Sequence, residues 1–428
     1  MKVFAILYCY PPILVPASLC YLKHVAGLRE RGVEVDVLSI EPSSFEAPNA
    51  GLHDGSLEKL MPSGVTNYRV KSLETNFFLK SLKRFGPGYD FFYKTFEPKK
   101  KEWVSPAVKF IDRHDMRGYD VILSCSQPHV NHLIGLHLKE KTSKPWVAYL
   151  SDPWSDNPYA SYRSEKIRRY HKELESKVIE KADRVLFTSE EMMKFVMRKY
   201  PSGMASKCAV VPHCFVREWY GAAAPVTQRG SKIRFLHTGH FYGIRTPMPL
   251  FRALARLNGE TPVGDAAEFL FFGKMADEYQ GFIRANGLDF VKVMDTIPYL
   301  KSLAEMRQAD YLLLIDAPLG DASESIFLPS KLVDYIGSSK PIIGITPSSG
   351  ASARVLRETG NKVCPIEDEE KIYSFVKQSI EDFRRSGQAA PSYGDGGFDS
   401  AAVALKFEKE LKSVMTGGRA PSLSARGL

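Results

Sequence analysis

The chain has 428 residues, which is too long for one typical hydrophobic core, so two domains are expected. Its apolar and charged fractions, 44% and 25%, are ordinary for a soluble globular protein, and no apolar run is long enough to span a bilayer. Six isolated cysteines show neither paired nor metal-ligand spacing, and the net charge of +9 is concentrated in residues 1–228.

The chain opens with a strand, a loop, a helix and a second strand. We predict a strand over residues 2–8, a loop over 11–18, a helix over 19–31 and a strand over 33–40. This order is typical of a doubly wound sheet, whose ligands lie at the carboxyl ends of the strands. The loop reads Pro-Pro-Ile-Leu-Val-Pro-Ala-Ser and lacks the glycine fingerprint of a dinucleotide site, which argues against NAD or FAD.

After a loop-rich stretch, residues 71–103 have a distinct basic and aromatic composition. They hold nine aromatic residues and a net charge of +4, and their apolar residues recur at helical spacing. One interpretation is a pair of amphipathic helices on an anionic membrane surface. The other is two helices docked on their own domain with basic outer faces.

Strands and helices then alternate through the rest of the first half. The predicted strands are 119–124, 146–150, 182–188 and 208–211, and the predicted helices are 130–141, 163–181 and 190–199. Residues 216–231 lack periodicity and are predicted to link the two domains.

Three residues at strand ends are the site candidates of the first half: Ser126, His129 and Asp152. A carboxylate such as Asp152, placed just past an apolar strand, can position or deprotonate a hydroxyl group. A turn-forming or helix-capping role explains Asp152 as well, and His129 could cap or pack beside Pro128.

The second half restarts with a strand over 233–238 and continues as a second alternating domain. Further strands are predicted over 268–272, 291–294, 311–315, 341–345 and 363–365, and helices over 248–257, 300–308, 329–336, 367–384 and 401–415. The expected domains are 1–220 and 231–395. A C-terminal helix within 396–416 is expected to pack back towards the first domain, and 417–428 is expected to be a disordered tail.

The stretch from Pro329 to Tyr335 carries the strongest signal. Proline suits the first position of a helix, and Lys331 and Asp334, three residues apart, share one face beside that helix start. Lys331 and free backbone N–H groups can bind phosphate, and a carboxylate can accept ribose hydroxyls. An ordinary sheet-packing helix with a solvated ion pair explains these residues equally well.

Gly239 and Arg245 add to this pattern in the second half. Gly239 follows a strand, where glycine lets the backbone approach a phosphate, and the Arg245 guanidinium can clamp a diphosphate. Arg245 alone is more simply a surface residue, but beside Lys331 the phosphate interpretation becomes the better one. No metal-ligand spacing and no serine-hydrolase elbow is present, so no metal is expected.

Over most of its length the chain resembles the retaining, nucleotide-sugar-dependent glycosyltransferases of GT-B fold, and among them glycosyltransferase family 4. The resemblance rests on Tyr10-Pro-Pro, Asp152-Pro-Trp, Thr238-Gly-His-Phe-Tyr-Gly-Ile-Arg245 and, most specifically, Pro329-Ser-Lys-Leu-Val-Asp-Tyr335. It implies two Rossmann-like α/β domains facing across a cleft, with the acceptor on the first and the donor on the second.

The resemblance also implies roles for individual residues. Asp152, Arg245 and Lys331 would be catalytic. The implied donor-binding residues are Gly239, His240, Arg245, Phe272, Gly273, Pro298, Tyr299, Leu328, Pro329, Ser330, Lys331 and Asp334. Within that set, Phe272, Gly273, Pro298 and Tyr299 would flank the base. Asp334 would replace a ribose-binding glutamate, and Ile326 stands where the family often has another glutamate. The first loop, at Pro16-Ala17-Ser18, also lacks the family's usual Gly-Gly.

The sequence therefore predicts a hexosyltransferase that uses a UDP- or GDP-linked sugar, with no metal or other cofactor. The expected acceptor is a glycan or lipid-linked hydroxyl, in cell-surface polysaccharide or glycolipid synthesis. We expect a cytoplasmic protein, peripheral on the inner face of the plasma membrane, that binds no nucleic acid. A nucleotide-sugar epimerase of the same fold and a non-catalytic nucleotide-binding or scaffold homologue are the alternatives.

Overall fold

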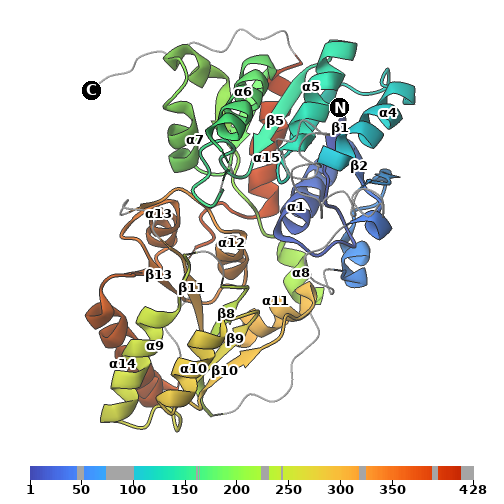
Figure 1. Ribbon diagram of the computed structural model, residues 1–428. Helices are drawn as coiled ribbons and strands as arrows, with labels where there is room; N and C mark the ends of the chain where they lie inside the picture. Colours follow the sequence, from blue (N-terminus) through green and yellow to red (C-terminus); the bar gives the residue numbers. More distant parts are fainter. Residues whose placement is uncertain are drawn as a thin grey trace, which may run out of the picture. The chain divides into compact units, whose positions relative to one another are not determined.

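A computed structural model gives the fold of the chain (Figure 1). The structure describes residues 1–45, 53–73, 101–160, 162, 164–222, 231–241, 244–317, 324–387 and 394–415. The chain divides into two compact units, the first made of Met1–Pro212 with the chain from Ala401 onward, and the second of His213–Ser400. Among the described helices, none has the length and apolar character needed to cross a membrane.

The first unit is built on a seven-stranded parallel sheet in the order β3-β2-β1-β4-β5-β6-β7. Its strands are β1 Lys2–Ile6, β2 Glu34–Ile40, β3 Asn67–Val70, β4 Val121–Cys125, β5 Trp146–Leu150, β6 Arg184–Phe187 and β7 Cys208–Val210. Its α-helices are α1 Pro16–Glu30, α4 Val104–Arg113, α5 Val130–Thr142, α6 Glu165–Lys181, α7 Glu190–Met197 and α15 Ser400–Ser413.

The central strands of this sheet are buried along their whole length. β4 (VILSC) and β5 (WVAYL) have no exposed residue, as expected for parallel strands covered on both faces by helices. The strand order reverses between β1 and β4, so the carboxyl ends of these strands border the crevice where open α/β sheets bind ligands. Ser126 follows β4 and Asp152 follows β5 at this edge.

The C-terminal helix α15 belongs to the first unit although it ends the described chain. Its Phe407 ring packs on Tyr149 of β5 and on His24 of α1, with centroids 5.7 and 5.3 Å apart. Its Glu410 carboxylate binds the Arg184 guanidinium at 2.6 Å. These contacts fix the helix against the sheet of the first unit.

The second unit holds a six-stranded parallel sheet in the order β10-β9-β8-β11-β13-β15. Its strands are β8 Ile233–Thr238, β9 Ala267–Phe272, β10 Val291–Met294, β11 Tyr311–Ile315, β13 Ile342–Thr346 and β15 Lys362–Pro365, with a separate pair, β12 Glu324–Ser325 and β14 Ser349–Gly350. Its helices are α8 Arg217–Ala222, α9 Met248–Glu260, α10 Asp277–Ala285, α11 Tyr299–Gln308, α12 Ser330–Gly337, α13 Ala351–Glu358 and α14 Glu369–Ser386. Helices α9 and α14 lie side by side in Figure 1.

The prediction of two doubly wound α/β units is confirmed, but several boundaries differ from those predicted. Strand β3 lies in the stretch expected to be loops, helix α4 was not predicted, and α1 begins at Pro16 rather than at residue 19. Pro329 precedes α12 as its N-cap, with an extended ψ of 132°, instead of opening the helix. The segment 74–100, with most of the predicted membrane-binding helices, and the tail 417–428 lie outside the described residues.

The boundary between the units also lies earlier than expected, at Pro212 and His213 rather than near residue 220. The predicted linker contains α8, and α8 packs on the second unit. The Tyr220 hydroxyl donates to the Asp334 carbonyl at 2.6 Å, and Arg307 donates to the Tyr220 carbonyl at 2.7 Å. A helix of only six residues gives too little periodicity to be recognised in the sequence.

Candidate functional site in the second unit

Two glycines bring the ends of β8 and β9 together. Gly239 and Gly273 follow these strands with φ angles of 113° and 139°, which side-chain-bearing residues rarely adopt. A Cβ atom on Gly273 would lie 2.4 Å from the Gly239 carbonyl oxygen, and one on Gly239 would lie 2.7 Å from the Lys331 ammonium. Both positions therefore require glycine, and they leave the backbone next to a cation.

Lys331, in the first turn of α12, directs its ammonium to the end of β8. Its Nζ lies 3.3 Å from Nε2 of His237, whose Nδ1 is 2.9 Å from the Leu313 carbonyl oxygen. Because a carbonyl can only accept, Nδ1 carries the proton and Nε2 accepts from Lys331. Burial, then the Arg245 guanidinium, lower the pKa of Lys331 to about 7, while Asp316 acts to raise it. Burial and Lys331 hold the pKa of His237 well below its usual value, so His237 is neutral.

Arg245 completes a cluster with two cations and one carboxylate. Its Nε lies 3.4 Å from Oδ1 of Asp316, which directly follows β11 and is buried. The other Asp316 oxygen accepts from the Ser352 hydroxyl at 2.8 Å. Only 10% of the Arg245 side chain is exposed, so its charge is held in place rather than free in solvent. The cluster therefore has an excess of positive charge whenever Lys331 is protonated.

Asp334 and Tyr299, both predicted to bind the nucleoside, are in contact. The Tyr299 hydroxyl donates to Oδ1 of Asp334 at 3.1 Å, and the two residues are 5% and 6% exposed. One residue further along α12, the Tyr335 hydroxyl accepts from the Thr238 amide at 2.8 Å. This bond ties α12 to the last residue of β8, so Lys331 and Asp334 are held at fixed places beside the strand end.

The other predicted donor residues lie around these two groups. His240 follows Gly239 and is half-buried. Its Nδ1 accepts from the Lys274 amide at 2.8 Å, and burial, Lys274 and Lys331 lower its pKa. Phe272 ends β9 and is buried, and Pro298 is the N-cap of α11. Leu328 is buried in the segment that leads to α12, and Ser330, the first residue of that helix, is half-buried.

In the first unit, the predicted acceptor-side residues lie together at the ends of β4 and β5. The Ser126 hydroxyl accepts a hydrogen bond from the Ser151 backbone amide at 3.0 Å and so links the ends of β4 and β5. Ser126 is fully buried and has no exposed surface for contact with a ligand. Asp152 is half-buried, and its Oδ2 accepts a hydrogen bond from the side-chain amide of Gln127 at 3.2 Å. The His129 ring stacks on Trp154 with centroids 4.9 Å apart, and burial lowers its pKa well below the usual value.

The sequence interpretation missed Asp316 and His237. Asp316 stands directly after an apolar strand, the same signal that singled out Asp152. His237 lies inside β8, where nothing in the sequence distinguishes it from a core residue. Within the described parts of the chain, no three His, Cys, Asp or Glu side chains are grouped so as to hold a metal ion.

The comparisons with known proteins give a partial family match and a common fold. Residues 21–218 match the model of Glycosyltransferase Family 4. No curated protein gives a significant sequence match. This match covers most of the first unit, and the two doubly wound units together have the GT-B fold.

Solved structures similar to this chain share its fold at low sequence identity. Sucrose-phosphate synthase from Thermosynechococcus elongatus has a TM-score of 0.64 and 14% identity, over 98% of this chain and 100% of that one. Anabaena HepE in complex with UDP and glucose has a TM-score of 0.61 and 15% identity, over 96% and 100%. A UDP-N-acetylglucosamine 2-epimerase has a TM-score of 0.56 and 12% identity, over 100% and 99%. At these identities the similarity is one of fold.

Proposed function

We propose that this glycosyltransferase moves a hexosyl group from a nucleotide-diphosphate sugar to a hydroxyl of a glycan or lipid-linked acceptor. The observation that carries the proposal is the cluster of Lys331 and Arg245 beside Gly239, with Asp316 as its carboxylate. A diphosphate would balance the positive charge that this cluster carries when Lys331 is protonated, and the adjoining glycine backbone leaves room for its approach.

The proposed chemistry follows from the charge that develops when the bond to the sugar breaks. The nucleoside diphosphate leaves with growing negative charge, and Lys331 and Arg245 are donors already fixed where that charge would appear. Their burial strengthens the interaction, because the site holds little solvent to screen it. In this proposal the sugar is transferred with retention, without an enzymic nucleophile, metal or other cofactor.

The nucleoside is assigned to the second group of residues. The Asp334 carboxylate would accept the ribose hydroxyls, with Tyr299 orienting it through their hydrogen bond. Phe272, Gly273 and Pro298 would flank the base. Anabaena HepE has been crystallised with UDP and with UDP-glucose, which makes UDP-sugars the first donors to test here.

The acceptor is assigned to the first unit, where Asp152 would position the attacking hydroxyl, with His129 nearby. We further propose a role in cell-surface polysaccharide or glycolipid assembly, at the cytoplasmic face of the membrane. The support is the basic and aromatic composition of residues 71–103, which suits an anionic lipid surface.

The proposal is tested by screening UDP- and GDP-sugars for thermal stabilisation, since a ligand that binds only the folded state raises its stability. Transfer from the stabilising donor is then compared between the wild type, Arg245→Ala and Lys331→Ala. The proposal fails if no nucleotide sugar stabilises the protein, or if both variants transfer as fast as the wild type.

An epimerase on the same fold is the rival activity, because one of the similar structures is a UDP-N-acetylglucosamine 2-epimerase. Incubating the enzyme with the donor and no acceptor separates the two activities. An epimerase returns an isomeric nucleotide sugar, whereas a transferase leaves the donor unchanged or hydrolyses it slowly.

A further inference from the structure

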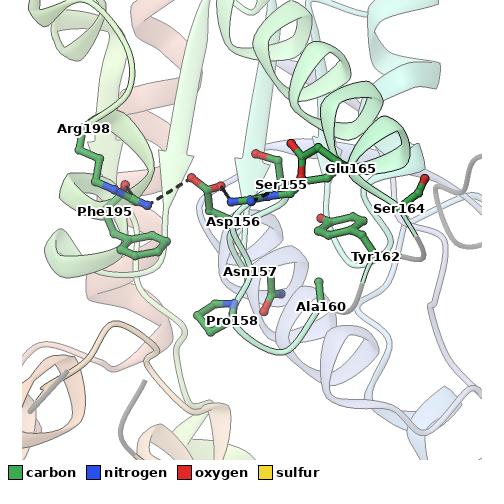
Figure 2. A pocket seen from close by; sticks show the side chains of 11 residues that line it. Ser155, Asp156, Asn157, Pro158, Ala160, Tyr162, Ser164, Glu165, Phe195 and Arg198 are labelled. Carbon is green, nitrogen blue, oxygen red and sulfur yellow. Dashed lines mark hydrogen bonds and ion pairs between the residues drawn. The ribbon is translucent and has the colours of Figure 1, made fainter. Parts of the chain in front are cut away.

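The first unit contains a polar pocket of about 490 Å³ beside the loop that joins β5 to α6 (Figure 2). The loop begins at Ser151 and contains Asp152. The side chains that matter in the pocket come from this loop, the start of α6 and the end of α7: Asp156, Tyr162, Glu165, Arg168, Phe195 and Arg198.

The floor of the pocket is held rigidly by Lys199. Its ammonium lies 2.8 Å from the Ser155 hydroxyl, 3.0 Å from Oδ2 of Asp156 and 2.8 Å from Oε1 of Glu175. These contacts use all three ammonium protons, so Lys199 has no donor left for a ligand. The Ser155 amide also donates to Oε2 of Glu175 at 2.7 Å. The Asp156 carboxylate is therefore fixed before any ligand arrives, and the surrounding cations, Lys199 first, hold its pKa low against the effect of burial.

Unlike the Lys199 ammonium, the Arg168 guanidinium makes only long contacts with the carboxylates around it. Its guanidinium lies 3.7 Å from Oδ1 of Asp156 and 3.8 Å from Oε2 of Glu165, both beyond hydrogen-bond distance. No described residue accepts a hydrogen bond from its guanidinium, and 54% of the side chain is exposed. Arg198 reaches Asp156 at 3.3 Å and lies over the Phe195 ring (Figure 2).

The Arg168 guanidinium therefore keeps N–H donors available beside the Asp156 and Glu165 carboxylates. A hydroxyl between a guanidinium and a carboxylate accepts from one and donates to the other, as a bridging water does. Among the described residues that line the pocket, the charges of Asp156 and Glu165 balance those of Arg168 and Arg198, so these side chains do not favour an anionic ligand. Tyr162, whose hydroxyl donates to the Trp154 carbonyl at 3.0 Å, and Phe195 add aromatic surfaces. A neutral ligand with several hydroxyls fits this set of groups.

We propose that this pocket binds a neutral saccharide unit of the acceptor, an inference that rests on the proposed function. The acceptor would then be a glycan, recognised through hydroxyls that bridge Arg168 to Asp156 and Glu165. Binding here, beside the loop that contains Asp152, would hold the acceptor on the first unit independently of the donor.

The test uses the full-length protein and the methyl glycosides of neutral hexoses, deoxyhexoses and N-acetylhexosamines, with binding followed by saturation-transfer difference NMR. Arg168→Ala should weaken the binding of any responding glycoside about tenfold or more, because hydrogen bonds to a charged group are lost. Lys172→Ala is the matched control, since Lys172 is exposed one turn further along α6 and does not line the pocket.

The outcomes separate this inference from the proposed function. Saccharide binding that depends on Arg168 but not on Lys172, with UDP binding unchanged in both variants, supports the pocket. If a saccharide binds in this way while no nucleotide does, the proposed donor site fails and the pocket stands. The pocket assignment is overturned if no glycoside binds or if both variants bind the glycosides equally well. It is also overturned if inorganic phosphate binds in an Arg168-dependent way while the glycosides do not bind.

Discussion

Raising the pH from 7 to 8.5 is expected to weaken UDP binding about fifteenfold, because it removes the proton from Lys331. With the pKa of Lys331 lowered to about 7, roughly half of the molecules carry a charged ammonium at pH 7 and about 3% do so at pH 8.5. If the charged form alone binds the diphosphate, the apparent Kd rises as that fraction falls. The affinity for UDP is therefore highest below the pKa of Lys331, where the amine is charged, and falls as the pH rises above that pKa.

Isothermal titration calorimetry with UDP, in two buffers of different ionisation enthalpy, measures both the Kd and the protons taken up. Uptake should grow from about half a proton at pH 7 to nearly one at pH 8.5, as binding recharges the amine. The terminal phosphate of UDP, with a pKa of about 6, is already mostly ionised over this range. His237 contributes no change, since its pKa is held well below 6.5.

Two variants test whether Lys331 is the titrating group. Lys331→Ala should bind more weakly and show no pH dependence. Lys274→Ala, which removes an exposed lysine next to the same loop, should keep the wild-type slope. A wild-type Kd that stays constant between pH 7 and 8.5, or a slope that survives in Lys331→Ala, would refute this account of the cluster.

Three further substitutions are expected to have distinct effects. Arg245→Ala should lower turnover on the order of a hundredfold, since it removes a fixed donor to the leaving diphosphate, and initial rates at saturating donor measure this. Gly273→Ala should lower the free energy of unfolding by roughly 1–3 kcal/mol in urea titrations, because its φ is 139° and a Cβ would clash with the Gly239 carbonyl. Tyr299→Phe should weaken UDP binding about tenfold by calorimetry, because Asp334 loses the hydroxyl that orients it.

Each of these substitutions has a control elsewhere in the chain. Arg252→Ala removes a half-exposed arginine on α9 and should leave turnover unchanged. Gly281→Ala, on α10 with open space around its Cβ, should be neutral or stabilising, as alanine favours a helix. Tyr170→Phe changes an exposed tyrosine on α6 and should bind UDP normally. Equal effects in a variant and its control would contradict the role assigned to that residue.

The parts of the site that local rules govern could be predicted from the sequence. Gly239 and Gly273 are recognisable because each directly follows an apolar strand, where a doubly wound fold binds ligands. Lys331 and Asp334 are recognisable because a spacing of three puts them on one helical face. These inferences need only the strand and helix periods and the position of strand ends, which short stretches of sequence encode.

The contacts that define the charges in the site could not be predicted in the same way. Tyr299 reaches Asp334 from 35 positions away, and His237 reaches Lys331 from 94, so both contacts depend on how α11, α12 and β8 pack. The lowered pKa of Lys331 likewise results from burial and from Arg245, neither of which is visible as a motif. The domain boundary was misplaced because α8, which is too short to show a period, belongs to the second unit.

Two of the three departures from the family pattern, Asp334 and Ile326, affect how much of the donor affinity the nucleoside side of the site can supply. The Asp334 carboxylate, one methylene shorter than a glutamate, is reached by the Tyr299 hydroxyl and is almost fully buried. Ile326, in place of the other glutamate, is 2% exposed, and a carboxylate there would lose its solvation in apolar surroundings. The cluster of Lys331, Arg245 and Asp316 carries a net positive charge when Lys331 is protonated. We therefore expect this chain to draw its donor affinity mainly from the diphosphate, which makes the proton on Lys331 the quantity that controls it.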